Sequence, residues 1–165
     1  MIVREEHPAA ALLLPAILAG IVAAIVVGVV WGLIVRWTDY EVGFVAWGIG
    51  FLVGFAVLGA TRGARGPVFQ VLAVICALFG ILVGKYLSFV WVLQDVANEE
   101  TGGAVDIPVF SMDTVDIFRD ELGTVFDWID LLWVGLAFYT AWRALQPEEP
   151  ETAPEEPAPD RGQTP

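Results

Sequence analysis

The sequence predicts an all-α integral membrane protein with about four transmembrane helices, a short amphipathic helix at the membrane interface and a disordered tail. Of the 165 residues, 57% are hydrophobic and 17% are charged, whereas about 25% of the residues in soluble domains are charged. Four apolar runs have lengths close to the roughly 20 residues that a helix needs to cross the hydrocarbon core. The chain is long enough for one compact domain, which we place at residues 9–145.

The first expected span covers residues 9–35, after a short amino-terminal segment at residues 1–8. The run is longer than a membrane crossing requires, so we expect a tilt, or a kink near Pro15. A cleaved signal peptide would have a shorter apolar run and a basic amino-terminal region. We therefore expect this span to be retained.

Residues 42–60 form the second expected span and residues 68–93 the third. The loop between them combines Arg62 and Arg65 with glycines and a proline, which break helices and mark a surface turn. Lys85 interrupts the third apolar run only after a stretch long enough to cross the core. The third span is therefore expected to end near or beyond this lysine.

An acidic outer loop is expected at residues 95–123. Within it, Val115, Phe118 and Leu122 recur at helical spacing among charged residues, which predicts a short amphipathic helix on the membrane surface. Gly123 is expected to end this helix.

Residues 124–145 form the fourth expected span, which carries Asp127 and Asp130 in its first two turns. The Pro- and Glu-rich segment 146–165 has no large apolar residue to repay the entropy of ordering, so we expect an acidic disordered tail. Four spans place both termini on the side of Arg62 and Arg65. The positive-inside rule then predicts cytoplasmic termini and an outward-facing acidic loop.

Composition argues against several classes of function. The formal charge of −12 comes mainly from acids in residues 95–130 and 148–160, and the eight basic residues are dispersed, so we expect no nucleic-acid binding. Cys76 and His7 are the only residues of their types, which argues against a disulfide, a cysteine zinc cluster and a nucleophile–histidine pair. We expect no metal or other cofactor, and a non-enzymatic protein.

Small residues recur every four positions on three of the expected spans. In lipid, helices approach closely where small side chains let their backbones touch. We therefore expect tight packing of the first three spans, and we read these stripes as packing surfaces in preference to a pore lining. The stripes are Gly20, Ala24, Gly28 and Gly32; Ala46, Gly50 and Gly54; and Gly80, Gly84 and Ser88.

Charged residues at the outer ends of the spans form a candidate polar cluster. We predict a contact between Glu41 and Lys85, because an antiparallel hairpin brings them to matching depth. Ionisable groups at membrane depth can mark an ion or proton path, but Lys85 can also reach the headgroups and acids can cap a helix. Structural pairing is favoured over a functional site. The cluster comprises Arg36, Asp39, Glu41, Lys85, Asp127 and Asp130.

The segment Thr38-Asp39-Tyr40-Glu41-Val42-Gly43 opens a glycine-rich span, and Gly80-Ile81-Leu82-Val83-Gly84 lies in a later one. This pattern resembles uncharacterised small bacterial multi-span membrane proteins over about residues 16–94. Asp39 stands where those proteins suggest glycine. The resemblance implies a helical core in a bacterial cytoplasmic membrane and carries no activity.

The sequence favours a structural or partner-binding component of a membrane assembly. Its expected partners are the lipid bilayer and either further copies of the chain or another membrane protein. A small transporter or channel subunit that uses the polar cluster is the alternative. A membrane enzyme that acts on lipid has the least support, because no nucleophile or activated base accompanies the acids.

Overall fold

The computed structural model describes residues 8–38, 43–103 and 105–147. This part of the chain is helical, and no strand occurs in it. Its six helices are α1 (Pro8–Thr38), α2 (Phe44–Ala60), α3 (Pro67–Thr101), α4 (Met112–Asp120), α5 (Leu122–Val125) and α6 (Trp128–Ala144).

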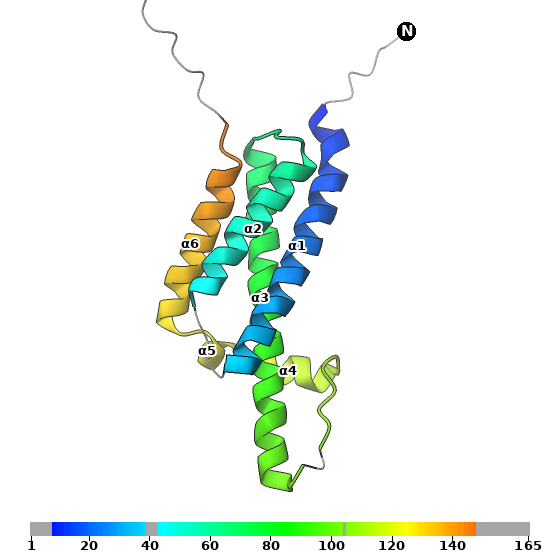
Figure 1. The fold of residues 1–165 in the computed structure, drawn as a ribbon, viewed down its shortest axis with the longest axis vertical. Coiled ribbons are helices and arrows are strands. Elements are labelled where there is room, and N and C mark those ends of the chain that lie inside the picture. The colour runs from blue at the N-terminus through cyan, green and yellow to red at the C-terminus, as the bar shows by residue number, and fades with distance from the viewer. Residues whose placement is uncertain (1–7, 39–42, 104, 148–165) are drawn as a thin grey trace, which may run out of the picture.

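Four of these helices form a bundle (Figure 1). Helix α3 packs against α1 most extensively, and α2 packs against α6. The start of α1, the turn between α2 and α3 and the end of α6 lie at one end of the bundle. Two interactions fix this end: the backbone N–H of Gly66 donates to the carbonyl of Leu145, and Gln70 Nε2 donates to the carbonyl of Trp142 at 3.1 Å.

Two helices are long and apolar enough to cross a membrane, Ala10–Thr38 and Pro67–Thr101, and the apolar α2 is shorter. Large apolar side chains on the outside of the bundle are exposed. On α1 they form a stripe at four-residue spacing, of which Val22 is 59% exposed. Because water-soluble proteins rarely expose contiguous apolar patches of this kind, the bundle exterior resembles a lipid-facing surface. The stripe consists of Leu14, Leu18, Val22, Val26 and Val30.

Glycines bring α1 and α3 into backbone contact. A Cβ atom added to Gly28 would lie 2.6 Å from the carbonyl oxygen of Gly80, and one added to Gly80 would lie 3.0 Å from the carbonyl oxygen of Ala24. A Cβ on Gly84 would strike the indole of Trp31, which is buried. The remaining glycines of the α1 stripe, Gly20 and Gly32, likewise meet Cys76 and Trp91 of α3.

The stripe on α2 contacts a helix that the sequence analysis did not assign to it. A Cβ on Gly50 would overlap the backbone of Ala137 in α6, and one on Gly54 would lie 3.2 Å from the Cα of Ala141. Ala137 and Ala141 are fully buried. The small residues of α2 therefore pack against α6, while those of α1 and α3 pack against each other.

Helix α3 continues beyond the expected end of the third span. The sequence analysis ended the span at residue 93 and placed a loop from residue 95, but the helix ends at Thr101. Gly102 follows in the left-handed conformation, with φ of 74°, and the N–H groups of Gly102 and Gly103 donate to the carbonyl of Asn98. Such a glycine cap ends a helix where the side chains alone do not.

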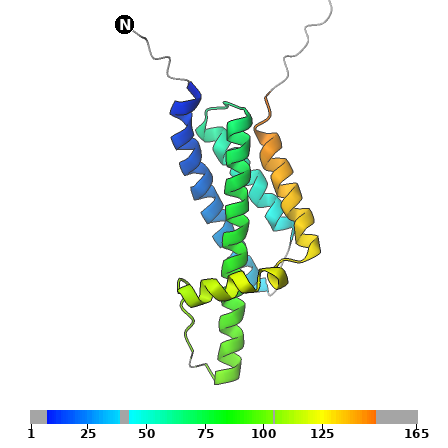
Figure 2. The ribbon, with the colours of Figure 1, turned by 180° about the vertical axis from the view of Figure 1, so that it is seen from behind.

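The last turns of α3 and the connection after them extend beyond the bundle (Figure 2). Together with α4, the described residues 94–103 and 105–121 are called the projecting segment. Helix α4 lies across α3. The Phe118 ring packs edge-on against Tyr86, with ring centroids 5.1 Å apart. Gln94 and Tyr86 hold the connection, because Gln94 Oε1 accepts from the N–H of Ile107 at 2.7 Å and the Tyr86 hydroxyl donates to the carbonyl of Val109.

The chain turns back into the bundle through α5. The expectation that Gly123 ends the amphipathic helix was wrong: α4 ends at Asp120, and Gly123 lies inside α5. The extended residue Phe126 separates α5 from α6, so the fourth apolar helix begins at Trp128 and not at residue 124. The break allows a capped start for α6.

Candidate functional site: a polar cluster at the end of the bundle

Lys85 is a buried charged residue at the end of the bundle where α6 begins. Its side chain is 3% exposed, and its Nζ donates to Asp130 Oδ2 at 2.7 Å and to the carbonyl oxygen of Val125 at 2.9 Å. The ammonium also lies 5.2 Å from the centre of the Phe126 ring. Burial of a charge is tolerated where it is paired and hydrogen-bonded, and Lys85 meets both conditions.

Asp130 has two partners because it caps the first turn of α6 as well as facing Lys85. Its Oδ2 accepts from the backbone N–H of Asp127 at 3.0 Å, and the Asp127 side chain accepts in return from the backbone N–H of Asp130. Asp127 Oδ1 also accepts from the N–H of Trp128 at 3.2 Å. This reciprocal arrangement is a capping box, which satisfies N–H groups that a helix start leaves free. The Lys85–Asp130 contact therefore joins the middle of α3 to the start of α6.

Arg36 forms a separate, more exposed arrangement with the outer part of α3. Its guanidinium lies 3.8 Å from an Asp95 carboxylate oxygen and 5.6 Å from the centre of the Trp91 ring. The two charged side chains are 38% and 56% exposed. Solvent weakens such a pair, so its contribution to stability is small.

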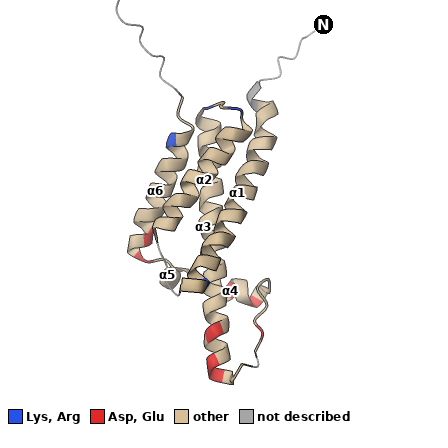
Figure 3. Ribbon diagram, viewed as in Figure 1, with Lys and Arg blue, Asp and Glu red and all other residues tan. Residues whose placement is uncertain are grey.

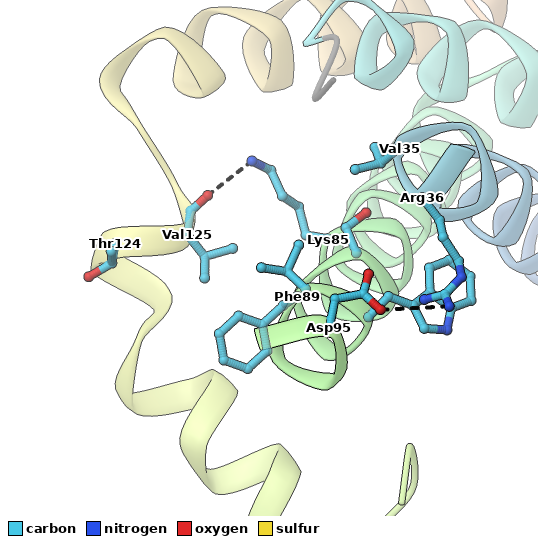
Figure 4. Close-up of a pocket in the computed structure, with 10 residues that line it drawn as sticks. Val35, Arg36, Lys85, Phe89, Asp95, Thr124 and Val125 are labelled. Carbon is cyan, nitrogen blue, oxygen red and sulfur yellow. Dashed lines mark hydrogen bonds and ion pairs between the residues drawn. The ribbon is translucent and has the colours of Figure 1, made fainter. Parts of the chain in front are cut away.

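A pocket of about 310 Å³ lies between these two arrangements. Figure 4 shows Lys85 reaching toward Val125 on one side of the pocket and Arg36 paired with Asp95 on the other. Ser88 also lines it, but its hydroxyl donates to the carbonyl of Gly84 on its own helix. The pocket thus combines two cations with one carboxylate at the end of the bundle.

The structure brings Lys85 and Asp130 together, with Asp127 on the adjoining helix cap, and it separates Arg36 from them across the pocket. The other predicted members, Asp39 and Glu41, lie outside the described residues, and so does the predicted Glu41–Lys85 contact.

Sequence reasoning missed Asp95, Trp91 and the Val125 carbonyl. Asp95 lies at three-residue spacing from Val92, which also lines the pocket, so a helix extended past residue 93 would have revealed it.

The chemistry available here is ion pairing and hydrogen bonding. In the described part of the chain, no group of three or more His, Cys, Asp or Glu side chains converges as a metal site would require. Comparison with protein-family models, with curated proteins and with solved structures finds no match.

Proposed function

We propose that the chain is a non-enzymatic integral membrane protein that serves as a structural or partner-binding component of a membrane assembly. The exposed apolar stripe of α1 supports the membrane location, because only 22% of the most apolar window of this helix is buried in the bundle. A core helix of a soluble protein would be mostly covered. A bundle with this exterior gains its apolar environment from lipid.

The hydrogen bonds that Lys85 donates support the proposal that the polar cluster has a structural role. Its ammonium has a carboxylate and a carbonyl within hydrogen-bonding distance, and that carboxylate also caps α6. A proton or ion path needs groups that exchange partners as the ion passes. Lys85 and Asp130 form a fixed joint between α3 and α6, which is the function of an anchor.

The projecting segment is the surface that we assign to a protein partner. Its eight carboxylates all come from exposed residues, and Arg119 is its one basic residue. Figure 3 shows acidic positions on the far end of α3 and near α4. A basic surface on a partner would be attracted to this charge and oriented by it. The carboxylates belong to Asp95, Glu99, Glu100, Asp106, Asp113, Asp116, Asp120 and Glu121.

The distribution of basic residues supports cytoplasmic termini. Arg62, Arg65 and Arg143 lie at the end of the bundle where α1 begins and α6 ends (Figure 3). The positive-inside rule places this end in the cytoplasm and the projecting segment on the opposite side. In a bacterial cell, the bundle would cross the cytoplasmic membrane, with four helices as its spans.

Copurification tests the partner-binding proposal. The full chain, a variant with Glu99→Gln, Glu100→Gln and Asp106→Asn, and a variant lacking residues 147–165 are extracted into nanodiscs and their associated proteins are identified by mass spectrometry. We expect a stoichiometric protein that is lost from the first variant and kept by the second. Recovery of the chain free of any such protein would contradict the proposal.

A small transporter or channel subunit is the second candidate, and the pocket beside Lys85 and Arg36 is the observation that favours it. Flux of protons and of small ions into liposomes distinguishes the two functions. Ion flux that is abolished by Glu41→Gln or Lys85→Met supports transport. If the liposomes show no more flux than protein-free ones, the structural role of the polar cluster is supported. An Arg62→Gln variant, changed at the opposite end, is the control.

A further inference from the structure

A second, largely apolar groove lies under the amphipathic helix α4. Its volume is about 730 Å³, within the range of small-molecule sites. Ile25 and Val29 of α1, Phe79 and Leu82 of α3, and Phe118 of α4 line it. The groove continues into the exposed apolar face of the bundle, since Ile25 and Phe79 are each close to half exposed.

The length of α3 indicates where the groove lies across the thickness of the membrane. The helix rises about 27 Å between Pro67 and Lys85, which is close to the thickness of the hydrocarbon core. Tyr86 and the Phe118 ring that packs on it therefore lie near the level where hydrocarbon meets headgroups. A groove just below this level faces the acyl chains of the surrounding lipid, and α4 lies where the headgroups are.

Charge at the rim identifies the headgroup that fits. Arg119, which lines the groove, lies 3.5 Å from an Asp116 carboxylate oxygen and 3.9 Å from one of Asp120. All three side chains are more than half exposed, so these contacts are weak and can be exchanged for a ligand. The rim offers a guanidinium for a phosphate and, beside it, two carboxylates for a cation.

We propose that this groove binds one acyl chain of a zwitterionic phospholipid with a primary ammonium headgroup, of the phosphatidylethanolamine type. Arg119 binds the phosphate, and Asp116 and Asp120 accept hydrogen bonds from the ammonium. A headgroup with net negative charge meets repulsion from the two carboxylates, and a quaternary ammonium has no hydrogen to donate to them. The inference rests on the proposed membrane location.

Lipid retention tests the inference. The full chain is reconstituted in vesicles with equal amounts of phosphatidylethanolamine, phosphatidylglycerol and phosphatidylcholine, extracted in mild detergent and weighed by native mass spectrometry. Ile25→Trp fills the groove, and its control is Ile21→Trp, one turn away on the same helix, with similar exposure and no place in the lining. We expect retained phosphatidylethanolamine, lowered roughly tenfold by Ile25→Trp and unchanged by Ile21→Trp.

The headgroup is tested separately by Arg119→Gln, with Arg62→Gln as the control at the opposite end. Loss of the charged contact should reduce the preference for phosphatidylethanolamine roughly threefold to tenfold while Arg62→Gln leaves it unchanged. Equal retention of all three lipids, or equal effects of the two tryptophan substitutions, would overturn the inference. Failure of the chain to enter the vesicles would instead refute the proposed membrane location.

Discussion

Two glycines of α2, Gly50 on the face packed against α6 and Gly48 on an open face, should respond to alanine substitution with opposite changes in stability. A Cβ on Gly50 would overlap the backbone of Ala137, which cannot move aside as a flexible side chain could. Overpacking of this kind costs about 1–3 kcal/mol, against a helix-propensity gain of about 0.5–1 kcal/mol for alanine over glycine. We expect Gly50→Ala to lower the free energy of unfolding by about 1–2 kcal/mol.

Gly48 is the matched control because it lies two residues earlier in α2, and a Cβ added there would meet no atom of another described segment within 4 Å. Gly48→Ala should therefore raise the free energy of unfolding by about 0.5–1 kcal/mol through helix propensity alone. Tryptophan fluorescence during unfolding in mixed detergent micelles measures both variants. Stabilisation by Gly50→Ala, or equal effects at the two positions, would refute the close approach of α2 and α6.

Three further predictions concern the polar cluster, α4 and the tail. Lys85→Met and Asp130→Asn should each cost about 3 kcal/mol of unfolding free energy, and the double variant should cost less than their sum, because each single change leaves the other group without its partner. Arg36→Met, at an exposed pair, should cost less than about 1 kcal/mol in the same assay; an equal loss would contradict the difference in burial. Ser111→Ala removes the side-chain acceptor for the N–H of Thr114 and should cost about 1 kcal/mol, seen as faster amide hydrogen exchange confined to α4. Deletion of residues 147–165 should leave membrane insertion unchanged, as measured by extraction with alkaline carbonate, and loss of insertion would refute the expected tail boundary.

Apolar run length predicted where the bundle helices lie because hydropathy reports the environment of the side chains. The first expected span, residues 9–35, falls within α1, and the second ends with α2 at Ala60. Hydropathy does not report where a helix stops. Residues 94–101 are mostly polar, yet they continue the helix until Gly102 adopts its left-handed conformation.

Lys85 stood out from the sequence as an interruption of an apolar run, and it was grouped with Asp130 in the candidate polar cluster. Its predicted contact with Glu41 stays a prediction, because Glu41 lies outside the described residues. The contact with Asp130, 45 residues away, forms because α6 packs against α2 and α3. Sequence spacing places a residue on a helix face, but the neighbouring helix depends on the packing of the whole bundle.

The small-residue stripes illustrate the same limit. Four-residue spacing correctly placed Gly28 and Gly50 on faces that another helix approaches. It could not distinguish α6 from α1 or α3 as the neighbour of Gly50, since α6 presents alanines in place of glycines at Ala137 and Ala141. Shape complementarity depends on the surfaces of both helices, and of these two only α2 was assigned a small-residue stripe from the sequence.

Cysteine accessibility tests whether the bundle is embedded in the membrane while the projecting segment lies in water. In a Cys76→Ala background, Val22→Cys and Glu99→Cys are each exposed to a water-soluble maleimide in intact vesicles and again after denaturation. Both native side chains are exposed in the structure, so protein packing alone would leave both cysteines reactive. If lipid covers the bundle, position 99 is labelled rapidly and position 22 only after denaturation. Rapid labelling at position 22 in intact vesicles would contradict a membrane-embedded bundle.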